Sequence, residues 1–88
     1  MMLEVVEFVA KSLVDTPDEV RTEEFEEDDG TVVIELTTAP DDMGKVIGKN
    51  GRVARALRQL IRAVGTREGV RATVDIVDEL SEPEDDED

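Results

Sequence analysis

Two glycines three residues apart enclose a lysine and an asparagine in the segment Gly48-Lys49-Asn50-Gly51. Because glycine has no Cβ, its backbone can turn sharply and approach another chain closely. Lysine adds a cation, and asparagine adds both hydrogen-bond donors and an acceptor. A helix that begins directly after such a loop would also direct main-chain N–H groups and a partial positive charge toward it. This combination predicts contact with a phosphate backbone.

The residues beside the loop extend the predicted contact. Lys45 and Arg52 would continue the positive charge on its rim, and Ile47 would line a neighbouring groove for bases. The absence of aromatic residues near the loop predicts modest affinity, because stacking of bases on aromatic rings is not available. The predicted set of nucleic-acid contacts is Lys45, Ile47, Gly48, Lys49, Asn50, Gly51, Arg52 and Arg55.

Catalysis is not expected from this composition. The chain contains neither cysteine nor histidine, so the usual general base, thiolate nucleophiles and the commonest metal ligands are missing. A nucleotide-binding P-loop needs four residues between its glycines and a hydroxyl after its lysine. Here Gly44 and Gly48 are separated by three residues, and Asn50 stands in the hydroxyl position. We therefore expect no enzyme, no cofactor and no metal site.

Charge is distributed unevenly along the chain, although the formal net charge is −14. Residues 44–72 contain eight basic side chains and one acidic side chain, a net charge of +7. Exposed charges more than about 8 Å apart are largely screened at physiological salt. A local cationic surface can therefore bind an anion although the whole chain is acidic.

Three segments before residue 40 predict regular secondary structure, and the second of them alternates only poorly. Residues 3–14 carry apolar side chains at helical spacing and predict a helix. Residues 20–27 predict a strand, and the Asp-Asp-Gly turn at 28–30 predicts a hairpin to a second strand at 31–38. The side chains expected on the buried face of that second strand are Val32, Ile34 and Leu36.

A short helix is predicted directly before the glycine loop. Pro40 suits a first helical turn, and Asp41 and Asp42 are expected at the positive end of this helix. Apolar residues at i, i+3 and i+4 give it one buried face, and Gly48 is expected to end it. The side chains on that face are Met43, Val46 and Ile47.

The longest predicted helix covers residues 52–64, with Gly65 expected as its C-terminal cap. Residues 70–77 alternate and predict a final strand. The far side of the long helix is expected to be mainly solvated and carries Arg55, Arg58 and Arg62. Both aromatic side chains are expected to pack in the core: Phe8 and Phe25. The order α-β-β-α-α-β predicts an α+β fold with a three-stranded sheet packed on three helices.

The chain resembles a KH domain of the α-β-β-α-α-β (type II) arrangement, and more narrowly the small single-domain bacterial RNA-binding proteins of the KhpA (YlqC-like) family. The resemblance covers about residues 2–77. It depends on a helix that leads into Asp-Thr-Pro-Asp-Glu-Val at 15–20. It depends most on Ala-Pro-Asp-Asp-Met-Gly-Lys-Val-Ile-Gly-Lys-Asn-Gly-Arg at 39–52, followed by Ala54, Leu57 and Arg58.

This resemblance implies binding of single-stranded RNA in the bacterial cytoplasm without a cofactor, and we expect a role as RNA chaperone or post-transcriptional regulator. It also implies a protein partner, either a second KH protein of the KhpB kind or another copy of the chain in a homodimer. The alternative is a protein-interaction module with a KH fold and only incidental RNA contact. The high negative charge favours this alternative, whereas the intact loop and the basic segment oppose it.

Length and composition limit the number of domains and the kinds of segment that the chain is expected to contain. Eighty-eight residues allow one small domain, expected at residues 2–77. Residues 78–88 contain eight acidic side chains and are expected to form a disordered acidic tail. The chain has no run of about 18 apolar residues and no basic region before its first apolar stretch, so neither a membrane span nor a secretory signal is expected.

Overall fold

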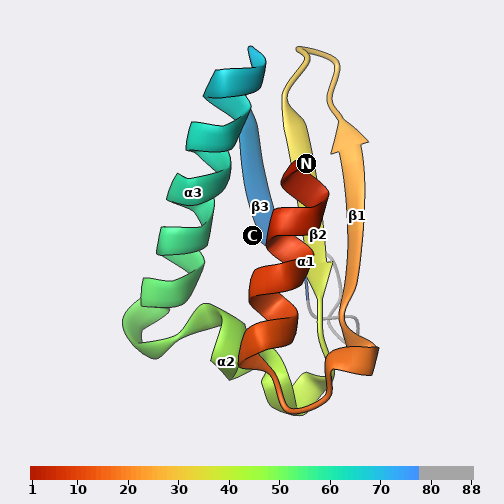
Figure 1. Cartoon of the computed structure of the whole chain (residues 1–88), viewed down its shortest axis with the longest axis vertical. Coiled ribbons are helices and arrows are strands. Elements are labelled where there is room, and N and C mark those ends of the chain that lie inside the picture. The colour runs from red at the N-terminus through yellow and green to blue at the C-terminus, as the bar shows by residue number, and fades with distance from the viewer. Residues whose placement is uncertain (78–88) are drawn as a thin grey trace, which may run out of the picture.

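The structure is a computed structural model that describes residues 1–77 (Figure 1). The predicted acidic tail at 78–88 lies outside the described residues. The elements follow the predicted order, with short 3₁₀ turns between them. They are α1 (Met2–Leu13), β1 (Arg21–Glu26), β2 (Val32–Thr37), α2 (Met43–Ile47), α3 (Arg52–Glu68) and β3 (Ala72–Ile76), with 3₁₀ turns η1 (Pro17–Glu19), η2 (Pro40–Asp42) and η3 (Lys49–Gly51).

One sheet contains all three strands in the order β1-β2-β3. Strands β1 and β2 pair antiparallel, and Gly30 closes their hairpin with a φ of 90°. Asp29 supports the turn, because its Oδ1 accepts a hydrogen bond from the main-chain N–H of Thr31 at 2.9 Å. Strands β2 and β3 are parallel, so the chain must cross back over the sheet between them. Helices α2 and α3 make that crossover and carry the glycine loop between them.

Helices α1 and α3 pack on the same face of the sheet (Figure 1). The predicted alternation of β2 is confirmed, since every second side chain of this strand is buried. Apolar residues from the helices and from the sheet make one core. Its fully buried large members include Val6 from α1, Ile34 and Leu36 from β2, Val46 from α2 and Ile61 from α3.

The end of α3 differs from the prediction. The helix continues to Glu68, and Gly69 caps it in the left-handed region with φ 79° and ψ 22°. Gly65, the expected cap, is a buried residue inside the helix. A Cβ there would lie 2.9 Å from the Cβ of Ala72 and 2.9 Å from the carbonyl oxygen of Val70. Gly65 is therefore needed for the close packing of α3 on β3.

Asp42 also has a different role from the predicted one. No side-chain hydrogen bond caps α2, and the Asp42 side chain is buried at 2% exposure. Its two carboxylate oxygens accept hydrogen bonds from the main-chain N–H groups of Asp15 and Thr16, at 3.2 and 3.0 Å. Asp42 thus fastens the segment after α1 to the start of α2, a contact between residues far apart in the sequence.

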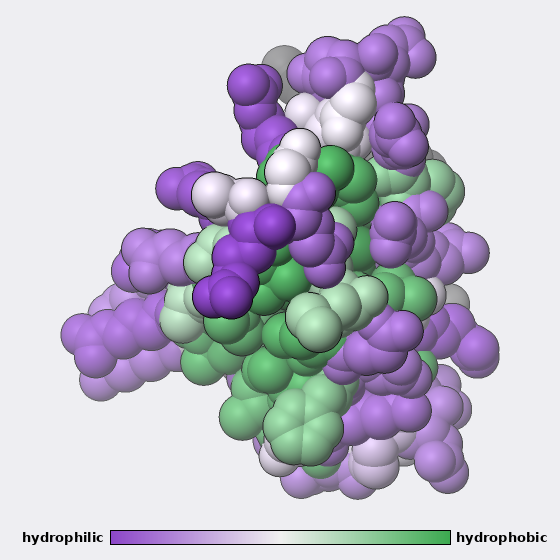
Figure 2. All heavy atoms as spheres, turned by 45° about the horizontal axis from the view of Figure 1, so that its top comes forward, coloured by the Kyte–Doolittle hydropathy of each residue, from purple (hydrophilic) through white to green (hydrophobic). Residues whose placement is uncertain are grey.

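The prediction that both aromatic residues belong to the core is wrong. Phe8 is 72% exposed on α1, and Phe25 is 47% exposed on β1. The core is closed by aliphatic side chains alone, so neither ring is needed in it. Figure 2 shows a hydrophobic area on the helical side of the molecule, surrounded by hydrophilic side chains.

Candidate nucleic-acid interface

The glycine loop is a tight turn between α2 and α3. Gly48 has φ 78° and ψ 168°, Asn50 has φ 56° and ψ 25°, and Gly51 has φ 74° and ψ 18°. The main-chain N–H of Gly51 donates to the carbonyl of Gly48 at 3.0 Å and closes the turn. Three of the four loop residues thus have a positive φ, which is rare for residues with a side chain.

The two glycines are required for different physical reasons. A Cβ on Gly48 would lie 2.5 Å from Cγ2 of Val53 and 2.8 Å from its main-chain nitrogen. A Cβ on Gly51 would meet only the Arg55 guanidinium, at 3.8 Å. Gly48 is therefore excluded from carrying a side chain by close packing as well as by φ, whereas Gly51 is constrained mainly by φ.

Lys49 and Asn50 lie at the exposed tip of the loop. As the first residues of the 3₁₀ turn, they have main-chain N–H groups without an acceptor inside the turn. Within residues 1–77, Lys49 takes part in no ion pair. The loop therefore presents an ammonium, an amide side chain and main-chain donors to solvent on one short stretch.

Arg55 holds the loop from the first turns of α3. Its Nη2 donates to the carbonyl oxygen of Asn50 at 3.0 Å. Because a guanidinium has five N–H donors, this contact leaves others for an anion. Arg52 is exposed at the first residue of α3. Both predicted arginines thus lie beside the loop.

Two other predicted residues lie on α2. Ile47 is its last residue and is 37% exposed, next to Gly48. Lys45 is directed elsewhere, since its ammonium lies 3.4 Å from Asp15 and 3.7 Å from Asp42. The charge of Lys45 is therefore partly neutralised by these carboxylates.

Arg58 and Arg62 lie outside the set of contacts predicted from the sequence. Nε of Arg58 donates to the carbonyl oxygen of Val74 at 3.1 Å, so this side chain bridges α3 and the outer edge of β3. Arg62 and Arg71 line a shallow hollow further along the same helix and strand. The spacing i, i+3, i+7 of Arg55, Arg58 and Arg62 could have indicated that all three belong to one surface, because it places their charges on one side of a helix.

These side chains define a basic stripe that begins at the loop and follows α3 beside β3: Arg55, Arg58, Arg62 and Arg71. No ion pair within residues 1–77 involves any of them. The stripe and the loop supply positive charge in a row, as the backbone of a nucleic acid requires.

Two other kinds of site are absent from the described residues. Among residues 1–77, no three histidine, cysteine, aspartate or glutamate side chains are grouped to hold a metal ion. In the same part of the chain, no helix combines the length and hydrophobicity that a bilayer crossing needs.

A Gly-x-x-Gly turn between two helices, packed with a third helix on one face of a three-stranded sheet, defines a KH domain of the α-β-β-α-α-β arrangement. The chain belongs to the KhpA/KhpB KH-domain family, whose model matches residues 3–76. The predicted fold class and family are therefore confirmed.

Similar proteins carry the same description in several bacteria. RNA-binding protein KhpA of Halalkalibacterium halodurans is 51% identical over 78 residues, which cover 88% of this chain and 100% of that protein. KhpA of Clostridium acetobutylicum is 47% identical and KhpA of Aquifex aeolicus is 49% identical; the matches cover 86% and 85% of this chain and 100% and 94% of those proteins.

A solved structure is similar in fold alone. The crystal structure of Aquifex aeolicus Era bound to GDP and AlF4⁻ superposes with a TM-score of 0.58 at 18% sequence identity. The match covers 88% of this chain and 29% of the Era chain. The KH-type arrangement of helices and strands is thus shared by proteins of very different sequence.

Proposed function

We propose that this chain binds single-stranded RNA through the Gly48–Gly51 loop and the basic stripe, in the bacterial cytoplasm and without catalysis. The observation that carries the proposal is the loop itself, in which close packing excludes a side chain at Gly48 and leaves Lys49 and Asn50 exposed. The relatives that are named RNA-binding proteins support it. A role as RNA chaperone or post-transcriptional regulator is part of the proposal.

The phosphate backbone would lie across the loop. The free main-chain N–H groups of Lys49 and Asn50 would donate to phosphate oxygens, and the Lys49 ammonium would add a charge-assisted contact. Arg55 would hold the loop in this shape while its remaining donors face the strand. The bases would lie beside Ile47 and along the edge of β3, where Arg58 already contacts a main-chain carbonyl.

The expected affinity is modest and depends on salt. KH loops hold about four nucleotides, and log K for single strands falls with log salt by about 0.7 per neutralised phosphate. The slope should therefore be no steeper than about −3. Stacking on aromatic rings is not expected to contribute, because Phe8 belongs to α1 and Phe25 to β1, and neither is part of the loop or of the helices beside it.

Fluorescence anisotropy with a labelled single-stranded RNA tests the proposal. The variant Lys49→Asp with Asn50→Asp places two anions against the phosphates and should abolish binding. The matched control is Lys11→Asp with Ser12→Asp, which changes the net charge equally at exposed positions on α1. Circular dichroism should show both variants folded. Equal RNA affinity in the wild type and the loop variant would refute the assignment of the loop.

One observation favours the alternative function of protein interaction. Phe8 on α1 and Leu60 on α3 are 72% and 43% exposed, and Figure 2 shows a hydrophobic area on the helical side of the molecule. Exposed apolar area of this kind often marks a contact with another protein. A second KH protein of the KhpB kind or a second copy of the chain would be its partner. If protein contact is the main function, Phe8→Ser should abolish capture of the partner, and the loop variant should leave that capture unchanged.

A further inference from the structure

The outer edge of β1 has main-chain groups that no other element of residues 1–77 uses. The hydrogen bond from Glu27 N–H to the carbonyl of Thr31, at 2.8 Å, sets the pairing pattern of the hairpin. Since hydrogen-bonded pairs alternate along an antiparallel ladder, the odd-numbered residues of β1 bond to β2 and the even-numbered residues face outward. The outward residues are Thr22, Glu24 and Glu26.

The other edge of the sheet is different. There the Arg58 side chain donates to the outward carbonyl of Val74 at 3.1 Å and covers the edge of β3. Among residues 1–77, no side-chain hydrogen bond reaches the main chain of Thr22, Glu24 or Glu26. Strand β1 is therefore the open edge of this sheet, and an open edge can pair with an added strand.

The open edge is strongly acidic. Residues 21–29 contain six acidic side chains and one basic side chain, and no ion pair within the described residues involves any of them. Glu23 lies directly opposite Glu35 on β2, which lies opposite Asp75 on β3. Like charges in such positions destabilise a sheet. A cationic partner would relieve this repulsion.

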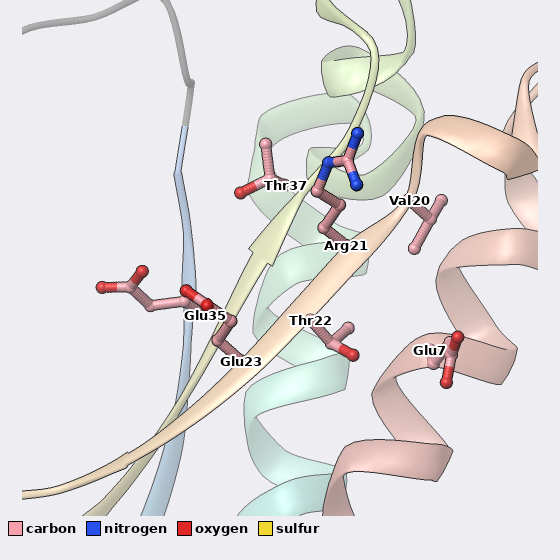
Figure 3. A pocket seen from close by; sticks show the side chains of 7 residues that line it. All are labelled: Glu7, Val20, Arg21, Thr22, Glu23, Glu35 and Thr37. Carbon is pink, nitrogen blue, oxygen red and sulfur yellow. The ribbon is translucent and has the colours of Figure 1, made fainter.

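Carboxylates flank the edge on both faces of the sheet. A hollow there is lined by Glu7, Val20, Arg21, Thr22, Glu23, Glu35 and Thr37. Figure 3 shows Glu23 and Glu35 extending on one side of the ribbon, while Thr22 points toward α1 and its Glu7. Alternate side chains of an added strand point to opposite faces, so each set would meet carboxylates.

We propose that the open edge of β1 binds an extended basic segment of another protein by strand addition. Main-chain hydrogen bonds to Thr22, Glu24 and Glu26 would provide affinity, and the flanking carboxylates would select lysine and arginine side chains. Charge excludes the occupants that the chain itself could supply. Two β1 edges would bring glutamates against glutamates, and residues 78–88 carry eight acidic side chains and no basic one.

The site is separate from the proposed RNA site, because β1 and the glycine loop lie at different parts of the molecule (Figure 1). Both ligands could therefore bind together. Strand addition at β1 does not depend on RNA binding, so the charge variant described below should bind RNA at least as tightly as the wild type does.

The test uses a labelled short peptide of alternating arginine and valine, and the full-length protein. Anisotropy should detect binding, and hydrogen exchange followed by NMR should show the amides of Thr22, Glu24 and Glu26 newly protected. The amides of Glu23 and Phe25, which already bond to β2, should change little. A peptide of alternating arginine and proline keeps the charge but cannot form a ladder, so it should bind about tenfold more weakly.

A charge variant provides the second measurement. Glu23→Gln, Glu24→Gln and Glu26→Gln together should weaken the arginine–valine peptide about tenfold or more. The matched control removes three exposed carboxylates elsewhere, by Asp18→Asn, Asp41→Asn and Glu68→Gln, and should bind the peptide as the wild type does. Equal affinity for the two peptides, or no added protection at the three outward amides, would overturn the proposal.

Discussion

Replacing each loop glycine by alanine separates two kinds of constraint. At Gly51 an added methyl group meets no atom closer than 3.8 Å, so only the left-handed backbone opposes it. At Gly48 the same methyl group would lie 2.5 Å from Val53 Cγ2 and 2.8 Å from Val53 N. We predict that Gly48→Ala destabilises the protein clearly more than Gly51→Ala.

The magnitudes follow from the geometry. A left-handed conformation costs about 1–2 kcal/mol for a residue with a side chain. Gly51→Ala should lower the free energy of unfolding by this amount. Gly48 lies at φ 78° and ψ 168°, where strain is about 1–3 kcal/mol, and overpacking adds about 1–3 kcal/mol. Alanine also restricts the unfolded chain, which offsets about 0.4–1 kcal/mol in both variants and cancels in the comparison.

Urea unfolding followed by circular dichroism measures both free energies of unfolding. The difference between the variants combines the overlap with Val53 and the greater backbone strain at φ 78° and ψ 168°, since Gly51 lies in the left-handed helical region. If the variants lose equal stability, the close approach of Gly48 to Val53 is not what requires a glycine there. In a Val53→Ala background the atom at 2.5 Å is gone, so Gly48→Ala should cost less stability there; an unchanged cost would contradict the overlap with the Val53 side chain.

Three further predictions concern the rest of the fold. Asp42→Asn should lower the free energy of unfolding by about 2 kcal/mol, because the amide cannot accept both main-chain hydrogen bonds as a carboxylate does. The exposed control Asp41→Asn should change it by less than about 0.5 kcal/mol. Gly65→Ala should lower the free energy of unfolding by about 1 kcal/mol, because overpacking against Val70 and Ala72 outweighs the gain from a better helix former. Gly44→Ala has open space around the added methyl group and should raise the free energy of unfolding by about 0.5–1 kcal/mol. NMR titration should give Asp29 a pKa below its ordinary 3.8, because a main-chain hydrogen bond in the hairpin turn favours its charged form.

Each of these predictions has an outcome that contradicts it. Equal unfolding midpoints for the two aspartate variants would mean that the buried contact is not stabilising. A stabilised Gly65→Ala would mean that α3 can move away from β3 without cost. The lowered pKa of Asp29 makes its contribution present above pH 3.8 and lost as the pH falls through the folded-state value. A hairpin that loosens well above that pH would disagree with this sign.

Opposite charges on two parts of one small domain fit the two proposed ligands. The loop and the stripe would attract a polyanion, and the open edge of β1 would attract a polycation. Because screening acts over about 8 Å at physiological salt, each surface can act locally although the chain as a whole carries −14. Both interactions should weaken as salt rises.

Local sequence determined the elements and the loop. Alternation along β2, the helix that begins at Arg52 and the glycines around Lys49 each depend on residues close in the chain, and each is confirmed by the structure. The same local signals led to the family. Helix ends were less certain, because a glycine such as Gly65 can serve either as a cap or as a place of close packing, and sequence spacing is equal in both cases.

Tertiary structure alone decided which contacts these residues make. Asp42 is buried because main-chain donors from the segment after α1 reach it, and the exposed Arg58 turns toward β3 because Val74 offers a carbonyl. Phe8 remains exposed because aliphatic residues from other elements already fill the core. In each case the partner lies far away in the chain or on another element, so the position of a side chain depends on how the layers pack and not on its own type.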